Sequence, residues 1–188
     1  MSNDKPISEA GQRELLNIAR RVIEAAARGL PDPDCRPAGP PELEQLLGAF
    51  VTLHKHGQLR GCIGSFLPDK PVWQVVAEMA RSSAMSDPRF PPMTEKELPH
   101  IRIEISVLSP LVRTNDPLSL ELGVHGIYVK RGWRSGTFLP QVATEYHMSK
   151  EEFLSTCCAH KAGLPPDSWK DPATEVYLYT AQIFQEAK

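Results

Sequence analysis

The chain has 188 residues, with 21 basic and 23 acidic side chains and a formal net charge of −2. This length can bury a full core without disulfides or metal ions, so we expect one domain, or one domain with a small lobe. The charge balance gives no general attraction for nucleic acid, and no apolar run approaches the roughly 18 residues of a membrane-spanning helix. Without a signal segment at the start, the sequence predicts a cytoplasmic protein that does not associate with membranes.

The cysteines and the glycines match no cofactor pattern. The four cysteines are Cys35, Cys62, Cys157 and Cys158, and no two of them form a C-x-x-C pair. The chain contains no P-loop, no G-x-G-x-x-G and no radical SAM cysteine triplet. We therefore predict free thiols in a reducing compartment, no metal site and no bound cofactor.

The first third of the chain predicts helices around a hairpin. Residues 8–28 repeat apolar side chains at helical spacing, with Ser8 as a cap, and a short helix is expected over 41–47. Residues 49–54 and 59–65 predict two strands of a β-hairpin. Pro68 to Pro71 open a further helix, which should end before Asp87-Pro88 because the residue preceding a proline avoids helical geometry.

The remainder predicts more strands and isolated helices. Thr94 to Glu97 fit a capping box, and residues 101–108 alternate cleanly between two faces of a strand. A second hairpin is expected over 124–130 and 133–139, followed by a capped helix from Ser149 and a last strand over 174–184. Hairpins mixed with separate helices, without a βαβ alternation, predict an α+β fold whose sheet is mainly antiparallel and flanked by helices.

The stretch LRGCIG, residues 59–64, is the most distinctive segment for chemistry. Alternate residues of a strand share a face, so Arg60 and Cys62 are expected to project together, about 7 Å apart along the backbone. Gly61 and Gly64 leave bare backbone around the sulfur, and a nearby arginine stabilises a thiolate. One interpretation is therefore an electropositive, reactive thiol site.

A structural interpretation of the same stretch stays open. A two-residue turn at His56-Gly57 would place Cys62 opposite Val51, in an apolar setting, and Arg60 opposite Leu53. A buried cysteine behaves as a small hydrophobic residue. Glycines beside it would then only allow a helix to pack closely on the sheet.

Several segments together resemble the AMMECR domain family, and LRGCIG is that family's signature hexapeptide. In chain order, the segments that carry the resemblance are residues 59–64, 87–90, 103–109, 125–126, 139–142 and 161–164. One departure is an extra residue within Cys157 to Lys161. The resemblance implies an AMMECR-like α+β fold with a larger and a smaller lobe, a cleft between them and the hexapeptide near that cleft. We expect one such domain over residues 8–186, after an N-terminal tail of residues 1–7.

The resemblance also implies partners. Prokaryotic members are commonly named protein A of the AmmeMemoRadiSam system, alongside a Memo-like protein and a radical SAM protein. It implies no particular reaction, since no biochemical activity is attached to the family.

Other residues complete the predicted site. Cys62, Glu104 and His125 are candidate catalytic groups: Glu104 as a general base or as the partner of Arg60, and His125 as a base for Cys62. A structural ion pair for Glu104 and a turn hydrogen bond for His125 are the simpler alternatives. The candidate substrate-binding residues are Arg60, Gly61, Gly64, Asp87, Arg89 and Gln141.

Three functions remain open at this level. The first is an enzyme, or enzyme subunit, in which Cys62 is a nucleophile or binding thiol tuned by Arg60. The second is a binding module that serves as partner or specificity subunit for a radical SAM or Memo-like protein. The third is nucleic-acid binding through Lys130, Arg131 and Arg134, which the acidic balance disfavours.

Overall fold

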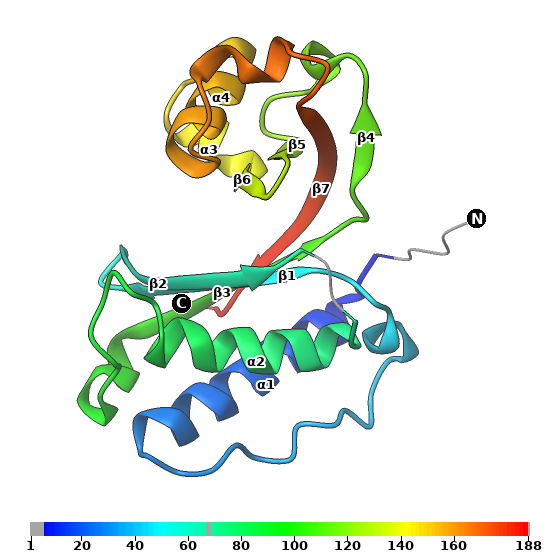
Figure 1. Ribbon diagram of the computed structural model, residues 1–188. Helices are drawn as coiled ribbons and strands as arrows, with labels where there is room; N and C mark the ends of the chain where they lie inside the picture. Colours follow the sequence, from blue (N-terminus) through cyan, green and yellow to red (C-terminus); the bar gives the residue numbers. More distant parts are fainter. Residues whose placement is uncertain (1–5, 67–68, 188) are drawn as a thin grey trace. The chain divides into compact units, whose positions relative to one another are not determined.

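The computed structural model describes residues 6–66 and 69–187 and divides the chain into two compact units. The first unit runs to Leu108 and takes up the chain again from Gln182, and the second unit is Ser109–Ala181. The helices are α1 (Glu9–Ala27), α2 (Val72–Met85), α3 (Pro140–Glu145) and α4 (Lys150–Thr156), with short 3-10 segments η1 (Pro41–Glu44), η2 (Glu95–His100), η3 (Pro117–Ser119) and η5 (Pro166–Lys170) and a π-helical turn η4 (Cys157–Lys161). The strands are β1 (Ala49–Lys55), β2 (Gln58–Ser65), β3 (Ile101–Leu108), β4 (Val112–Thr114), β5 (His125–Arg131), β6 (Arg134–Phe138) and β7 (Glu175–Gln185) (Figure 1).

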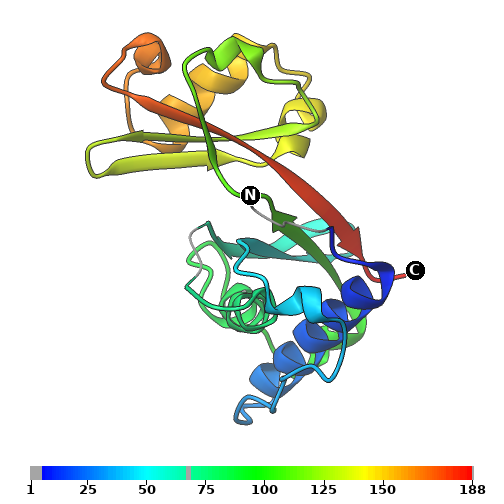
Figure 2. The same ribbon diagram turned by 90° about the vertical axis from the view of Figure 1, so that its right-hand side faces the viewer.

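In the first unit, two helices cover one face of a small antiparallel sheet. β1 lies between β2 and β3, and both pairings are antiparallel. α1 and α2 lie side by side beneath these strands (Figures 1 and 2). Their apolar stripes meet the alternate apolar residues of the strands, because a helix with one apolar stripe must bury it against another element. The core of this unit includes Leu15, Ile18, Ile23, Val51, Leu53, Val76, Ile103, Ile105 and Phe184.

Ile7 and Glu186, near the two ends of the described chain, both make contacts within the first unit. Ser8 caps α1 by accepting the backbone N–H of Gly11 at 3.2 Å. Ile7 is 2 % exposed, and its N–H donates to the side-chain oxygen of Gln182 at 2.9 Å. Arg20 of α1 pairs with the carboxylate of Glu186. Residue 7 of the expected tail therefore packs in the core, while residues 1–5 of that tail lie outside the described residues.

The second unit has its own core beside strands β4 to β7. β5 pairs with β6 on one side and with β7 on the other, and the short strand β4 pairs with β7, all antiparallel. Its apolar residues gather between these strands and the segments α3, α4 and η4. The core of this unit includes Leu120, Ile127, Val129, Phe138, Phe153, Leu154, Cys157, Cys158 and Val176.

The α+β class with a mainly antiparallel sheet is confirmed, and so are most of the predicted elements. The helix expected over 41–47 is only a 3-10 turn, Pro41–Glu44, because a proline-led segment of four residues is too short for an α-helix. The predicted helix start at Pro68 lies outside the described residues. The sequence patterns predicted neither the strand β4 nor the helix α3. These elements are only three and six residues long, which is too short for a clear periodicity.

The segment Cys157–Lys161, for which an extra residue was expected, forms the π-helical turn η4. A π-turn holds one more residue than an α-turn, so a helix can absorb a single added residue without shifting the rest of the chain. Cys157 and Cys158 are both fully buried in this turn. Among the described residues, no helix is both long enough and apolar enough to span a membrane.

Candidate functional site

The β1–β2 hairpin contains a register shift that decides where Cys62 lies. His56 and Gly57 form its two-residue turn, both with positive φ (52° and 79°), which is the backbone twist that tight hairpins favour. The pairing begins as predicted, with His54 opposite Leu59, but it shifts by one residue at the next pair. Arg60 is the extra residue of this β-bulge.

The shift corrects the register that the structural interpretation assumed. Cys62 lies opposite Thr52, not Val51, and Gly61 lies opposite Leu53. Because successive side chains of a strand point to opposite faces, a one-residue shift moves every later side chain to the other face. Cys62 is therefore on the face away from the core, which Val51 and Leu53 occupy from the same strand β1.

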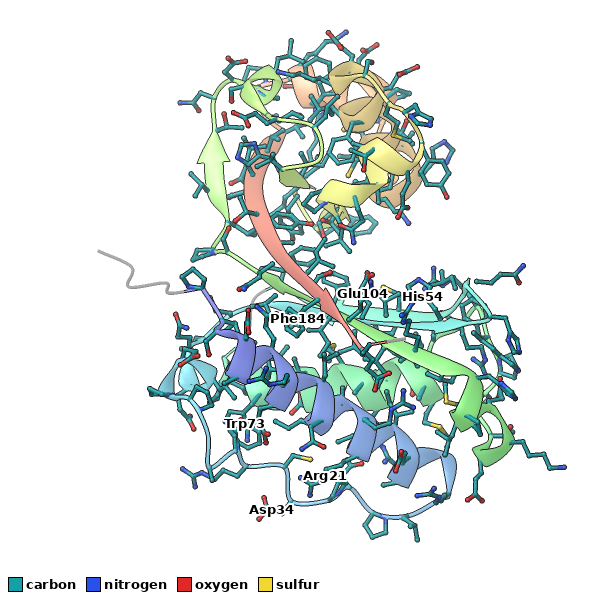
Figure 3. The ribbon with its side chains drawn as sticks, turned by 180° about the vertical axis from the view of Figure 1, so that it is seen from behind. Arg21, Asp34, His54, Trp73, Glu104 and Phe184 are labelled. Carbon is teal, nitrogen blue, oxygen red and sulfur yellow. The ribbon has the colours of Figure 1, made fainter. Side chains whose placement is uncertain are left out.

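Cys62 belongs to a line of three polar side chains across three neighbouring strands. Thr52 pairs with Cys62 on one side and with Glu104 of β3 on the other. We call Cys62, Thr52 and Glu104 the polar row. Figure 3 shows Glu104, together with His54 of β1, on the face of the sheet opposite α1 and α2.

The thiol of Cys62 is held as a neutral group. Burial raises its pKa above the ordinary cysteine value. A hydrogen bond from the Thr52 hydroxyl, with an O–S distance of 3.3 Å, and the charge of Arg89 act in the opposite direction, while the carboxylates of Asp87 and Glu104 add to the increase. At neutral pH the sulfur is consequently a thiol and not a resting thiolate.

Asp87 and Arg89 bind the outer edge of β2 at Cys62. The backbone N–H of Cys62 donates to Asp87 at 2.9 Å, and the Arg89 guanidinium donates to the Cys62 carbonyl at 3.2 Å. The same guanidinium donates twice to the Asp87 carboxylate, at 2.7 and 2.9 Å. These bonds from Arg89, followed by the Cys62 N–H, lower the pKa of Asp87 to about 2. β2 is the edge strand of its sheet, so this pair replaces the missing neighbour at one residue.

Arg60 does not accompany the thiol, which corrects the predicted pairing. Its guanidinium is bound to the Glu97 carboxylate at 2.9 and 3.2 Å and to the Pro91 carbonyl at 3.0 Å. Arg60 is 8 % exposed, and its hydrogen bond holds the pKa of Glu97 well below the usual range. The partner of Arg60 is thus Glu97 and not Glu104, and the cation that lowers the pKa of Cys62 is Arg89.

The two glycines of LRGCIG leave space that protein atoms fill. A Cβ atom on Gly61 would clash with the backbone carbonyl of Ser83 in α2, and a Cβ on Gly64 would clash with the ring of Phe50. The Ser83 hydroxyl also bridges the strands, donating to the Val51 carbonyl at 2.8 Å and accepting the Ile63 N–H at 2.9 Å. These contacts agree with the packing interpretation of the glycines, and a role for them in substrate binding stays a prediction.

His125 and Gln141 lie in the second unit. His125 Nδ1 accepts the backbone N–H of Glu121 at 2.9 Å, which is the turn hydrogen bond of the simpler alternative. Gln141 lies in the first turn of α3, and its buried Oε1 has no hydrogen-bond partner within residues 6–66 and 69–187. Cys62 belongs to the first unit, so a Cys62–His125 pair stays a prediction.

The described residues contain no group of three His, Cys, Asp or Glu side chains arranged to hold a metal ion. Two of the histidine rings, those of His56 and His100, pack against each other with centroids 4.8 Å apart.

Sequence reasoning missed Thr52 and Glu97. Thr52 interrupts the apolar run of β1, and that polar interruption was a usable signal for the second face of the strand. Glu97 was identified only as part of the capping box, which does form, yet its carboxylate also binds Arg60 and Lys55.

The fold and this site are those of an α+β protein whose half-buried cysteine lies on an edge strand, at one end of a polar row. The family model described as AMMECR1 matches residues 16–184, and the chain belongs to this family. A relative from Methanothermobacter thermautotrophicus is 46 % identical and covers 96 % of this chain and 97 % of its own length. One from Nanoarchaeum equitans is 42 % identical, covering 92 % and 98 %.

A solved structure shares the fold. The crystal structure of an uncharacterised protein from Pyrococcus horikoshii is 40 % identical, with a TM-score of 0.85, and the match covers 92 % of this chain and 89 % of that one. This similarity supports the AMMECR-like fold.

Proposed function

We propose that the polar row of Cys62, Thr52 and Glu104 is a binding surface of a protein-modification system of the AmmeMemoRadiSam type. In this proposal the chain is the partner or specificity subunit that works with a radical SAM protein and a Memo-like protein. The observation that carries it is the bulge at Arg60, which turns Cys62 away from the core into a row of polar groups.

The state of the thiol favours binding over nucleophilic attack. The thiolate is the reactive form of cysteine, and the pKa of Cys62 is raised, chiefly by burial. A neutral thiol next to a hydroxyl and a carboxylate offers donors and acceptors to a polar group.

The backbone around the thiol is also held in place before any partner arrives. The Cys62 N–H donates a hydrogen bond to Asp87, and the Cys62 carbonyl accepts one from Arg89. The Ser83 hydroxyl accepts a hydrogen bond from the N–H of Ile63, the residue after Cys62. Such a pre-organised surface loses little conformational freedom on binding, which favours affinity.

A Cys-dependent enzyme is the second candidate, and one observation favours it. The carboxylate of Glu104 lies close enough to act on the pKa of Cys62, and Thr52 stands between them in the row. If a substrate displaced solvent here, Glu104 would be placed to receive the thiol proton as a general base.

Alkylation of Cys62 separates the two candidates. We expect iodoacetamide to modify Cys62 more slowly at pH 7 than a free thiol, because the raised pKa leaves less thiolate. The rate should still be rising at a pH at which that of a free thiol has levelled off, as read by mass spectrometry of the full chain. A control variant, Cys35→Ser, removes a different buried thiol and should leave the Cys62 profile unchanged. Rapid, site-selective alkylation at neutral pH would favour the enzyme instead.

Co-purification tests the partner role. The tagged chain should capture radical SAM and Memo-like proteins from the same cell, and Cys62→Ser should still capture them. Glu104→Gln should weaken capture, while Glu44→Gln, an exposed carboxylate on η1, should not. Failure of the wild-type chain to associate with either partner would count against the proposal, as would turnover by the isolated chain that Cys62→Ser abolishes.

A further inference from the structure

A cavity of about 440 Å³ lies within the second unit, where β4 ends and β7 begins. Thr114 of β4 pairs with Val176 of β7. The segment before β7, residues 169–174, supplies further residues of the lining. The volume is within the range of small-molecule sites, roughly 300 to 1,000 Å³. The residues that line it are Arg113, Thr114, Asn115, Pro117, Trp169, Lys170, Asp171, Pro172, Thr174 and Val176.

The charged side chains that line the cavity are mainly basic. Arg113 and Lys170 line it with side chains that are 56 % and 58 % exposed. The one carboxylate of the lining, Asp171, pairs with Arg131 at 2.9 Å, and Arg131 does not line the cavity. Within the lining itself, two cations therefore stand beside one carboxylate, and that carboxylate is paired with Arg131.

Among the described residues, neither cation pairs with a buried carboxylate, and the Lys170 ammonium lies 5.2 Å from the centroid of the buried Trp169 ring. Arg113 approaches Glu175 only to 3.8 Å, and that carboxylate accepts the Tyr177 hydroxyl at 2.6 Å. Lys170 pairs with Asp167 at 2.7 Å, but Asp167 is 75 % exposed. Exposed ion pairs of this kind contribute little, so an incoming anion competes with them easily.

Hydroxyl and apolar groups complete the lining. Thr174 is 6 % exposed, and its Oγ1 has no partner among the residues that the structure describes. A buried hydroxyl without a hydrogen bond is unfavourable, and a small shift on ligand binding would satisfy it. Pro117, Pro172 and Val176 offer apolar contact to the body of a ligand.

We propose that this cavity is a second binding site, independent of the polar row, for a small organic anion. The anionic group, a phosphate or a carboxylate, binds between Arg113 and Lys170. The apolar body of the ligand contacts the prolines and Val176. Arginine in particular matches the geometry of either anion with paired N–H donors.

Three probes of similar shape test the proposal on the isotope-labelled full chain by NMR titration. Phenyl phosphate and benzoate carry the two candidate anions, and benzyl alcohol carries none. We expect at least one anionic probe to shift the amides of residues 113–115 and 170–174 saturably. Benzyl alcohol should bind at least about tenfold more weakly than the better anionic probe. The anion that binds more tightly identifies the ligand class.

Variants place the binding at the cavity. Arg113→Gln should weaken binding of the better probe about tenfold. Asn115→Asp adds a carboxylate at an exposed lining position and should also weaken it, which keeps the test valid if Arg113→Gln folds poorly. The control Arg134→Gln removes an equal charge from the same unit outside the cavity and should leave the affinity unchanged. Absence of saturable shifts, equal binding of benzyl alcohol, or wild-type affinity in both lining variants would overturn the proposal.

Discussion

The hairpins β1–β2 and β5–β6 resemble each other in their close-packed glycines but differ in the register of their strands. Each contains a glycine onto which another segment packs: Gly61 against Ser83 of α2, and Gly136 against Lys161 and Ala162 at the π-turn. The β5–β6 pairing runs in one register from Arg131 opposite Arg134 to Ile127 opposite Phe138. The β1–β2 pairing is interrupted by the bulge at Arg60.

The difference shows how one inserted residue separates a structural hairpin from a candidate site. Without a bulge, alternation carries every side chain of β6 to the face expected from its turn. With a bulge, Cys62 is transferred from the core face to the polar row. Substitutions at the glycines, at the bulge and in the polar row test this difference between the two hairpins.

Alanine at the two close-packed glycines should give the largest effect. We expect Gly61→Ala and Gly136→Ala each to lower the free energy of unfolding by about 3 kcal/mol or more, because the added methyl group meets backbone atoms that cannot rotate away. Urea denaturation measures both. Gly39→Ala, where the nearest atom is 3.9 Å from the added carbon, is the matched control and should be nearly neutral. Wild-type stability of Gly61→Ala would show that α2 does not pack on β2 as described.

Removal of the charge at the bulge comes next. Arg60→Met should lower the free energy of unfolding by about 2 to 3 kcal/mol, since it leaves the half-buried Glu97 carboxylate with fewer partners. Lys55→Met removes a more exposed partner of the same carboxylate and should cost less than about 1 kcal/mol. If the two variants were equally destabilised, the special role of Arg60 at the bulge would be wrong.

Acid titration tests the Asp87–Arg89 pair. The pKa of Asp87 in the folded chain is about 2, below the value near 4 of an unfolded chain. Its contribution is therefore present above about pH 4 and is lost as the pH falls through about 2. Asp87→Asn should cost about 2 kcal/mol at pH 7 and almost nothing near pH 2.

The matched control for this titration is Asp167→Asn, which alters a carboxylate that is 75 % exposed and should show no such trend. A stability difference between wild type and Asp87→Asn that stays constant from pH 7 to pH 2 would argue against the pair.

The smallest expected effect is on the thiol itself. Thr52→Val removes the hydroxyl that donates to the Cys62 sulfur, and this hydrogen bond lowers the pKa of the thiol. The pKa of Cys62 should therefore rise, and its alkylation profile should move to higher pH, while stability changes by less than about 1 kcal/mol. Thr52→Ser keeps the hydroxyl and should leave the profile near that of the wild type. An unchanged profile in Thr52→Val would contradict the hydrogen bond.

Short-range patterns were enough to predict most elements. The helical spacing of Leu15, Ile18 and Val22 predicts α1, the alternation of residues 101–108 predicts β3, and the capping boxes at Thr94 and Ser149 both form. These patterns succeed because each depends on residues within one or two turns of helix or a few positions of strand. The motif order likewise indicated the family correctly.

The arrangement of the site was beyond such patterns. Arg60 was expected beside Cys62 because both belong to one strand, but its carboxylate partner, Glu97, lies 37 residues away. Arg89 approaches Cys62 from a loop, 27 residues away. Pairings over such separations depend on how the elements pack, which local spacing does not encode.

The class of fold, the position of most helices and strands and the family of this chain could thus be predicted from residue patterns, because hydrophobic periodicity and capping are local properties. The face on which Cys62 lies, the partner of Arg60 and the cavity beside Arg113 became known from the packed molecule. The physical reason is that a single bulge reverses the alternation of a strand, and in this chain the bulge lies where Glu97 and the backbone of α2 meet the hairpin from distant parts of the chain.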